Sequence, residues 1–144
     1  MDYNFYNWKI IKLGYIHDGD SYKDYTLDLG FNNEWVKRDL RLYGIDTPEV
    51  KGVQKEAGGL VRDYIIYLHQ LNPDVLYWIH SFKDEQHKYG EVLANYYIEN
   101  ICINDHLLEK KYAKEYFGGK KSPWTQSELD YIINDLKWLN NGFR

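Results

Sequence analysis

The order of the alternating segments constrains the fold of this chain more than any other feature. Three runs of β-type alternation come first, a helical segment follows, and two further β-type runs come after it. The five runs are Trp8–Ile16, Tyr22–Leu29, Trp35–Ile45, Val75–Phe82 and Val92–Ile98. Three meandering strands, a helix and then two more strands is the order of a five-stranded OB-fold barrel. The sequence therefore predicts an α+β, mainly β fold: an OB-fold barrel with three helices.

Three helices are expected between and after these strands. Apolar residues recur at helical spacing over residues 57–68, although Gly58-Gly59 weakens the start of that helix. Asn104 is expected to cap a short second helix. Thr125 and Glu128 have the spacing of a capping box, which predicts where the last helix begins.

Composition is that of one soluble globular domain over residues 1–144, with 44% hydrophobic and 28% charged residues. The single cysteine excludes an internal disulfide, which fits a reducing compartment. No apolar run is long enough to span a bilayer, and the N-terminus lacks the basic start and apolar block of a signal peptide. We therefore expect a cytoplasmic protein (in the host cytoplasm if the source is viral), monomeric and without a membrane partner.

The net charge of −4 argues against a broad basic surface for nucleic acid. The lysines of residues 109–121 are most simply a solvated face. A second positive cluster, Arg38, Arg41 and Lys51, lies beside the acidic motif described next.

Residues 39–49, read together with residues 18–20, hold the side chains that phosphodiester hydrolysis requires. Arg41 can grip a phosphate with two parallel hydrogen bonds. Asp20 and Asp46, with the Thr47 carbonyl, are a plausible partial shell for a hard divalent cation such as Ca²⁺. Glu49 can activate a water molecule as general base.

Each of these residues also has a structural explanation. An Asp-Gly pair such as Asp18-Gly19 is more often a turn than a site. Glu49 can simply be exposed, and Arg41 can pair with Asp39 or Glu49 on the surface of its strand.

Several motifs in this order resemble the staphylococcal (micrococcal) nuclease, or thermonuclease, family. Residues 18–21 read DGDS where family members usually have DGDT, and residues 41–49 read RLYGIDTPE, close to the family pattern RLxGIDTPE. Residues 88–94 read KYGEVLA, which is similar to KYGRxLA. The resemblance extends over residues 8–139, and residues 27–31 and 116–121 look more like phage-encoded members than secreted bacterial ones.

The resemblance implies an OB-fold nuclease that requires Ca²⁺ and acts on DNA, RNA or both. It implies metal ligation by Asp20 and Asp46, and contacts of Lys88 and Tyr89 with the phosphate of the nucleotide. Tyr116 or Phe117 corresponds to an aromatic residue that packs near the base.

Glu91 departs from the family pattern, because the arginine of KYGR is the second phosphate-binding group of the family. Loss of one preorganised donor costs on the order of 100- to 1,000-fold in rate. Three interpretations follow: a weak nuclease, a nuclease in which Lys88, Lys51 or Arg38 has taken over, or a binding site without chemistry. We therefore expect a calcium-dependent nuclease, with a catalytically inactive module that binds nucleic acid or protein as the alternative.

Overall fold

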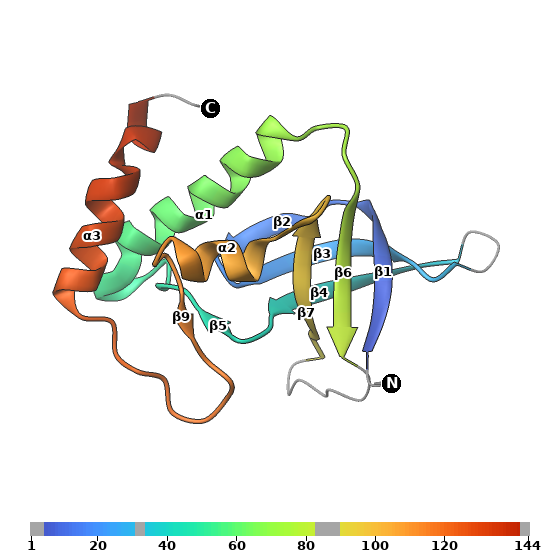
Figure 1. Ribbon diagram of the computed structural model, residues 1–144, viewed down its shortest axis with the longest axis horizontal. Helices are drawn as coiled ribbons and strands as arrows, with labels where there is room; N and C mark the ends of the chain where they lie inside the picture. Colours follow the sequence, from blue (N-terminus) through green and yellow to red (C-terminus); the bar gives the residue numbers. More distant parts are fainter. Residues whose placement is uncertain (1–4, 31–33, 83–89, 142–144) are drawn as a thin grey trace.

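A closed barrel of five strands forms the centre of the molecule (Figure 1). The computed structural model describes residues 5–30, 34–82 and 90–141. Around the barrel the strand order is β1-β6-β7-β4-β3, and β1 pairs with β3 to close it. The bounds are β1 Phe5–Lys12, β3 Ser21–Asp28, β4 Trp35–Leu42, β6 Tyr77–Phe82 and β7 Val92–Ile98. The pairing of β4 with β7 is parallel and the other four are antiparallel, so the barrel is mixed. The predicted OB-fold barrel is confirmed.

The first expected strand is two strands in the structure. β1 ends at Lys12, and β2 (Tyr15–Asp18) begins after Leu13-Gly14 and pairs with β3. A Cβ atom on Gly14 would lie 1.8 Å from the carbonyl oxygen of Lys23, so only glycine allows the backbone to approach β3 this closely. The prediction of one continuous strand over Trp8–Ile16 was therefore wrong at this turn.

The third expected strand is also shorter than predicted. β4 stops at Leu42, and Gly44 turns the chain with a φ of 77° that favours glycine. The short strand β5 (Ile45–Asp46) then leaves the barrel and pairs antiparallel with β9 (Lys114–Glu115). This turn carries Asp46 away from the strand that holds Arg41. A further short strand, β8 (Ile101–Cys102), pairs with β7.

Three tyrosine rings fill much of the barrel interior. Tyr22, Tyr25 and Tyr96 are almost fully buried. The ring of Tyr96 meets those of Tyr22 and Tyr25 edge-on, with centroids 4.9 and 5.8 Å apart. Such edge-to-face contacts add to the gain from burying the rings. The barrel that carries the site is thus a packed core.

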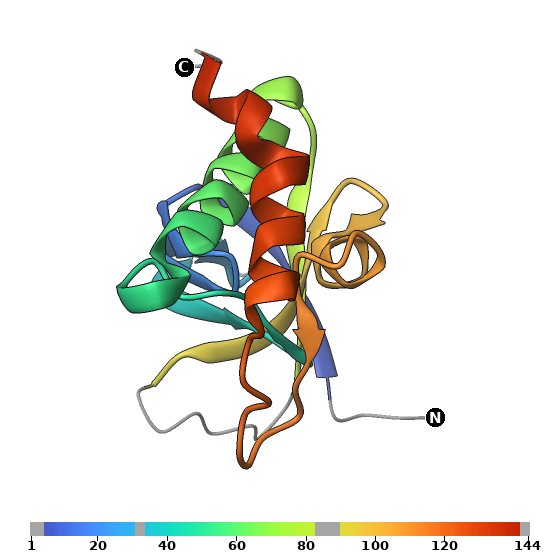
Figure 2. The same cartoon turned by 90° about the vertical axis from the view of Figure 1, so that its left-hand side faces the viewer.

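The helices lie on one side of the barrel (Figures 1 and 2). The 3₁₀ turn η1 (Gly52–Gln54) leads into α1 (Lys55–Leu71), which packs against β2 and α3. The others are α2 (Ile103–Glu109), α3 (Gln126–Leu136) and the 3₁₀ turn η2 (Lys137–Asn141). Figure 2 shows α1 and α3 side by side. None of the helices in these described ranges is both long and apolar enough to cross a membrane.

The two expected helix starts have different outcomes. The capping box of α3 is confirmed: the Thr125 side chain accepts from the Glu128 backbone, and the Glu128 side chain accepts in return. Asn104 does not cap α2, because Cys102 is the N-cap and Asn104 lies inside the helix. The buried Asn104 amide instead bonds the Tyr96 N–H and the carbonyls of Tyr43 and Ala94. Unpaired buried backbone groups are costly, which explains this use of the side chain.

Candidate active site

The predicted catalytic and metal-binding residues meet around one cavity. Its volume is about 370 Å³, and it lies where the β2–β3 turn, β4, β5 and the segment after β9 come together. Its lining residues are Asp18, Asp20, Ser21, Lys23, Arg41, Asp46, Thr47, Glu49, Glu91, Tyr116 and Lys121. They come from four separate stretches of sequence, so barrel closure brings them together.

Arg41 is positioned by the register of β3 and β4. Ser21 faces Arg41 across the two strands, and the Leu42 backbone N–H donates to the Asp20 carbonyl over 2.9 Å. The Arg41 Nη1 lies 2.7 Å from Asp20 Oδ1. The ion-pair partner of Arg41 is therefore Asp20, and not Asp39 or Glu49. A guanidinium has five N–H donors, so this ion pair leaves others for a ligand.

Asp20 is a buried carboxylate with a raised pKa. Its exposed fraction is 2%, and burial is the largest cause of the rise, followed by the nearby Asp18 carboxylate. The Arg41 guanidinium and the Thr47 backbone N–H, which donates to Asp20 Oδ2 over 3.1 Å, act in the opposite direction. Any additional positive charge that enters the cavity would therefore stabilise the ionised form of Asp20.

Asp46 is held by the segment between β9 and α3. Lys121 Nζ lies 3.1 Å from Asp46 Oδ1, and the Trp124 indole N–H donates to Asp46 Oδ2 over 3.1 Å. The segment loops past β5 in Figure 1. The carboxylate is buried, while the Lys121 side chain is 43% exposed. The cationic partner of Asp46 therefore comes from the solvent-exposed side of the cavity.

Glu49 lies at the exposed edge of the cavity. Its backbone N–H donates to the Gln54 side chain over 2.8 Å, which ties the loop to η1. Helix α1 packs directly on this loop: a Cβ atom on Gly58 would lie 2.1 Å from the Glu49 carbonyl oxygen. The position of the Glu49 loop therefore depends on Gly58 of α1, even though glycine has a low helix propensity.

The cavity suits a hard divalent cation by the chemistry of its donors. Among its described lining residues, five carboxylates face three cations, a formal charge of −2. Asp20 and Asp46, the predicted ligands, both already contact a protein cation. The hydroxyl of the adjacent Thr47 is buried and has no hydrogen-bond partner within the described ranges. Oxygen donors of this kind are those that Ca²⁺ prefers. Nowhere in residues 5–30, 34–82 and 90–141 do three or more His, Cys, Asp or Glu side chains gather as a complete metal cluster.

The structure describes only one of the three predicted substrate-binding residues, Tyr116. Tyr116 lines the cavity, and its hydroxyl donates to the Gly119 carbonyl over 2.8 Å. Phe117 is 68% exposed and packs edge-on against Tyr43, with ring centroids 5.5 Å apart. Lys88 and Tyr89 lie outside the residues that the structure describes.

Lys23, Lys121 and Trp124 are site residues that the sequence did not indicate. The alternation of the strand after Asp20 was a usable signal for Lys23, because Ser21 and Lys23 are two residues apart on that strand. The contacts of Lys121 and Trp124 join residues 75 and 78 positions apart, and no local pattern predicts them. Of the cations proposed from sequence to offset Glu91, neither Lys51 nor Arg38 lines the cavity.

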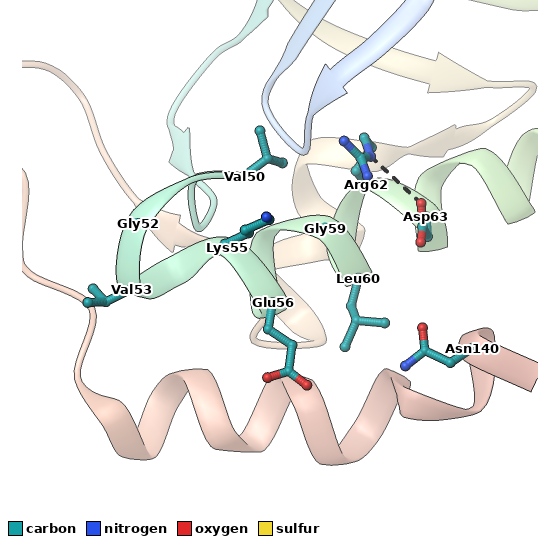
Figure 3. Close-up of a pocket in the computed structure, with 10 residues that line it drawn as sticks. All are labelled: Val50, Gly52, Val53, Lys55, Glu56, Gly59, Leu60, Arg62, Asp63 and Asn140. Atoms are coloured by element: carbon teal, nitrogen blue, oxygen red, sulfur yellow. Dashed lines mark ion pairs between the residues drawn. The ribbon is translucent and has the colours of Figure 1, made fainter.

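A second cavity, of about 590 Å³, lies at the start of α1 (Figure 3). Val50, Gly52, Val53, the first turns of α1 and Asn140 of η2 line it. Its polar groups include the Arg62–Asp63 pair, 3.7 Å apart, and it holds none of the predicted site residues. We assign it no role.

Comparison with known proteins agrees with the geometry. Residues 39–135, more than half of the chain, match the family model described as staphylococcal nuclease homologue. The match includes Arg41, Asp46, Thr47 and Glu49, while Asp20 and Lys23 lie before its first residue. A comparison with curated proteins gave no match.

Proposed function

We propose that this chain, which belongs to the family of staphylococcal nuclease homologues, is a calcium-dependent nuclease that hydrolyses phosphodiester bonds in DNA, RNA or both. The observation that carries the proposal is the convergence of Arg41, Asp20, Asp46 and Glu49 on one cavity. A purely structural role gives no reason to gather carboxylates beside an arginine, since like charges at one point destabilise the fold.

Arg41 is the proposed phosphate ligand. One of its nitrogens is held by Asp20, which fixes the plane of the guanidinium and directs the remaining N–H groups. A donor fixed in advance stabilises the charge that develops on the phosphate oxygens without reorganisation at the moment of reaction.

Glu49 is the proposed general base. Its carboxylate lines the cavity at the solvent edge, where a water molecule can reach both the carboxylate and a phosphate held by Arg41. Asp20 and Asp46, with Thr47, would hold the cation. When bound, Ca²⁺ supplies positive charge to the phosphate, and its charge of +2 matches the formal −2 of the cavity lining.

Glu91 supports a second candidate function, a nucleic-acid- or protein-binding module without chemistry. Its side chain lines the same cavity and is only 8% exposed. A carboxylate in this position opposes the entry of a phosphate and slows any cleavage.

A digestion experiment separates the two functions. A fluorescently labelled oligonucleotide, as DNA and as RNA, is incubated with the protein in Ca²⁺ or in a chelator. The nuclease is expected to cleave only in Ca²⁺, and Arg41→Ala and Glu49→Gln are each expected to lower the rate by about 100-fold or more. Glu109→Gln, on the exposed end of α2, is the matched control and should cleave like wild type. Binding of the oligonucleotide without any cleavage would favour the binding module.

A further inference from the structure

We propose that Lys23 is a second phosphate-binding cation of this site, held in place beside Arg41 by the carboxylates of Glu91 and Asp39. The inference rests on the proposed function and extends it to a residue outside the matched family segment and outside the predicted site.

Alternation along β3 places Lys23 on the outer face of the strand, next to a β-bulge. The register of β3 and β4 shifts between Tyr22 and Tyr25, and Asp24 inside this bulge has a φ of 58°. The bulge returns Tyr25 to the barrel interior beside Tyr22, while the Lys23 side chain stays outside, where it lines the cavity with Arg41. Bulges are common next to active sites.

Asp39 contacts both the backbone of the bulge and the side chain of Lys23. Its Oδ1 accepts from the Asp24 backbone N–H over 3.0 Å, and its Oδ2 lies 3.8 Å from Lys23 Nζ. One carboxylate on β4 therefore sets both the backbone and the position of the ammonium group.

The ammonium group of Lys23 keeps its capacity to donate. It is 3.8 Å from Glu91 Oε2 as well as from Asp39 Oδ2, and both distances exceed those of a direct hydrogen bond. These are loose ion pairs that hold the charge in place, and the three N–H donors of the ammonium group can still reach a third acceptor. The side chain is 28% exposed, so an anion in the cavity can approach it.

The negative charge of Glu91 must be offset by a nearby cation if a phosphate is to bind in the cavity. The nearly buried Glu91 carboxylate would repel a phosphate, and Lys23 Nζ lies 3.8 Å from its Oε2. One nitrogen of Arg41 is already paired with Asp20, and Lys121 is already paired with Asp46. Lys23 thus places a positive charge near Glu91 and lines the cavity together with Arg41, where both can reach one phosphate.

The test compares Lys23→Met, Lys23→Arg and a control, Lys9→Met, which removes an exposed lysine of β1 that does not line the cavity. In Ca²⁺-dependent cleavage of a labelled oligonucleotide, Lys23→Met is expected to lower kcat by about 10- to 100-fold, somewhat less than loss of a fully enclosed donor. Lys23→Arg should recover most of that loss, and Lys9→Met should match wild type. Thermal melting of each variant confirms that it folds.

A second arm measures binding without cleavage. In the Glu49→Gln background, fluorescence anisotropy of a labelled single-stranded DNA oligonucleotide is followed in Ca²⁺ as salt is raised. Loss of one phosphate contact should reduce the slope of log K against log salt by about 0.7 for Lys23→Met alone. A lysine that only braced the bulge would change the melting temperature and leave this slope unchanged.

The outcomes separate the two proposals. Wild-type cleavage with Lys23→Met equal to wild type in kcat and salt slope would overturn the role of Lys23 and leave the nuclease intact. Binding without cleavage, with the slope reduced in Lys23→Met, would overturn the nuclease and support the lysine. A wild-type protein that neither binds nor cleaves the oligonucleotide would overturn both.

Discussion

Asp20 lies at the point where three parts of the site meet. Its two carboxylate oxygens face the Arg41 guanidinium on β4 and the Thr47 N–H on the loop after β5, while Asp18 approaches from the end of β2. The side chain therefore joins the strand that carries the proposed phosphate ligand to the loop that carries the proposed metal ligands. Its environment penalises the negative charge that those roles need.

A neutral replacement of Asp20 should stabilise the calcium-free protein. The pKa of Asp20 is raised in the folded state, so the folded protein holds a proton that the unfolded chain releases, and stability falls as pH rises above the usual aspartate pKa of 3.8. At higher pH, where the folded protein has also lost this proton, the loss of stability keeps its full size. Asp20→Asn keeps an acceptor for the Thr47 N–H and removes this cost, so its melting temperature near pH 7 in a chelator should exceed that of wild type.

The comparison across pH gives the control. The advantage of Asp20→Asn should shrink as pH falls toward 4, where wild-type Asp20 takes up its proton. A variant that melts below wild type at pH 7 would show that the Arg41 ion pair outweighs burial of the charge.

Asp46 provides a direct test of calcium binding. Removing its carboxylate takes away one proposed ligand, so Asp46→Ala should lose the calcium-binding heat that calorimetry detects in wild type. Glu109→Ala, on the surface of α2, serves as control and should bind as wild type does. Equal binding by Asp46→Ala would place the ion elsewhere.

At the scale of elements, helix α1 sets the position of the loop that carries Glu49, the proposed general base. The two adjacent glycines near its start look equivalent by helix propensity, but they have different surroundings. Gly58 faces the backbone of Pro48 and Glu49, while the nearest atom to a Cβ on Gly59 is Arg62 Nη2, at 3.9 Å. The close approach at Gly58 is what lets the Glu49 loop rest on the helix.

Alanine substitutions should separate these two glycines. Gly58→Ala is expected to destabilise the protein by about 1–3 kcal/mol through overpacking against rigid backbone, and to lower cleavage by displacing Glu49. Gly59→Ala should stabilise the helix by about 0.5–1 kcal/mol with cleavage unchanged. Urea unfolding and the oligonucleotide assay measure both effects; equal stabilities would show that the loop moves freely.

At the scale of the whole molecule, His69 links helix α1 to the barrel core. Its Nδ1–H donates to the Ile65 carbonyl over 2.7 Å, so in the neutral ring Nε2 accepts from the Tyr96 hydroxyl over 2.8 Å. The ring stacks on Tyr77 with centroids 5.1 Å apart. Burial lowers the pKa of His69, which keeps the ring neutral in the folded state.

This buried histidine should make stability depend on pH. Below the unfolded pKa of about 6.5, the unfolded chain binds a proton that folded His69 resists, so stability present above that pH is lost as pH falls. The slope can reach about 1.4 kcal/mol per pH unit for this one proton. His69→Gln should lose less stability than wild type between pH 8 and 5 in urea unfolding. Parallel curves for the two proteins would assign the acid sensitivity to other groups.

Periodicity, which depends on neighbouring residues, was enough to predict the barrel, and the capping box correctly marked the start of α3, whereas the cap expected at Asn104 of α2 was wrong. Local sequence was also enough for the arginine and the acidic loop: Arg41, Asp46, Thr47 and Glu49 lie within nine consecutive residues, so a strand followed by a Gly turn already places them close together.

Only the tertiary structure decided what surrounds these residues. The contacts of Lys23 with Glu91, and of Lys121 and Trp124 with Asp46, join segments that are distant in the sequence. The break at Gly14 and the use of Asn104 to satisfy β7 depend on how neighbouring segments pack. A local pattern reports which face of a strand or helix is buried, but it does not report strand register or the path of a connecting loop. Those depend on how the whole chain closes the barrel, and they determine which cations stand beside the carboxylates of the site.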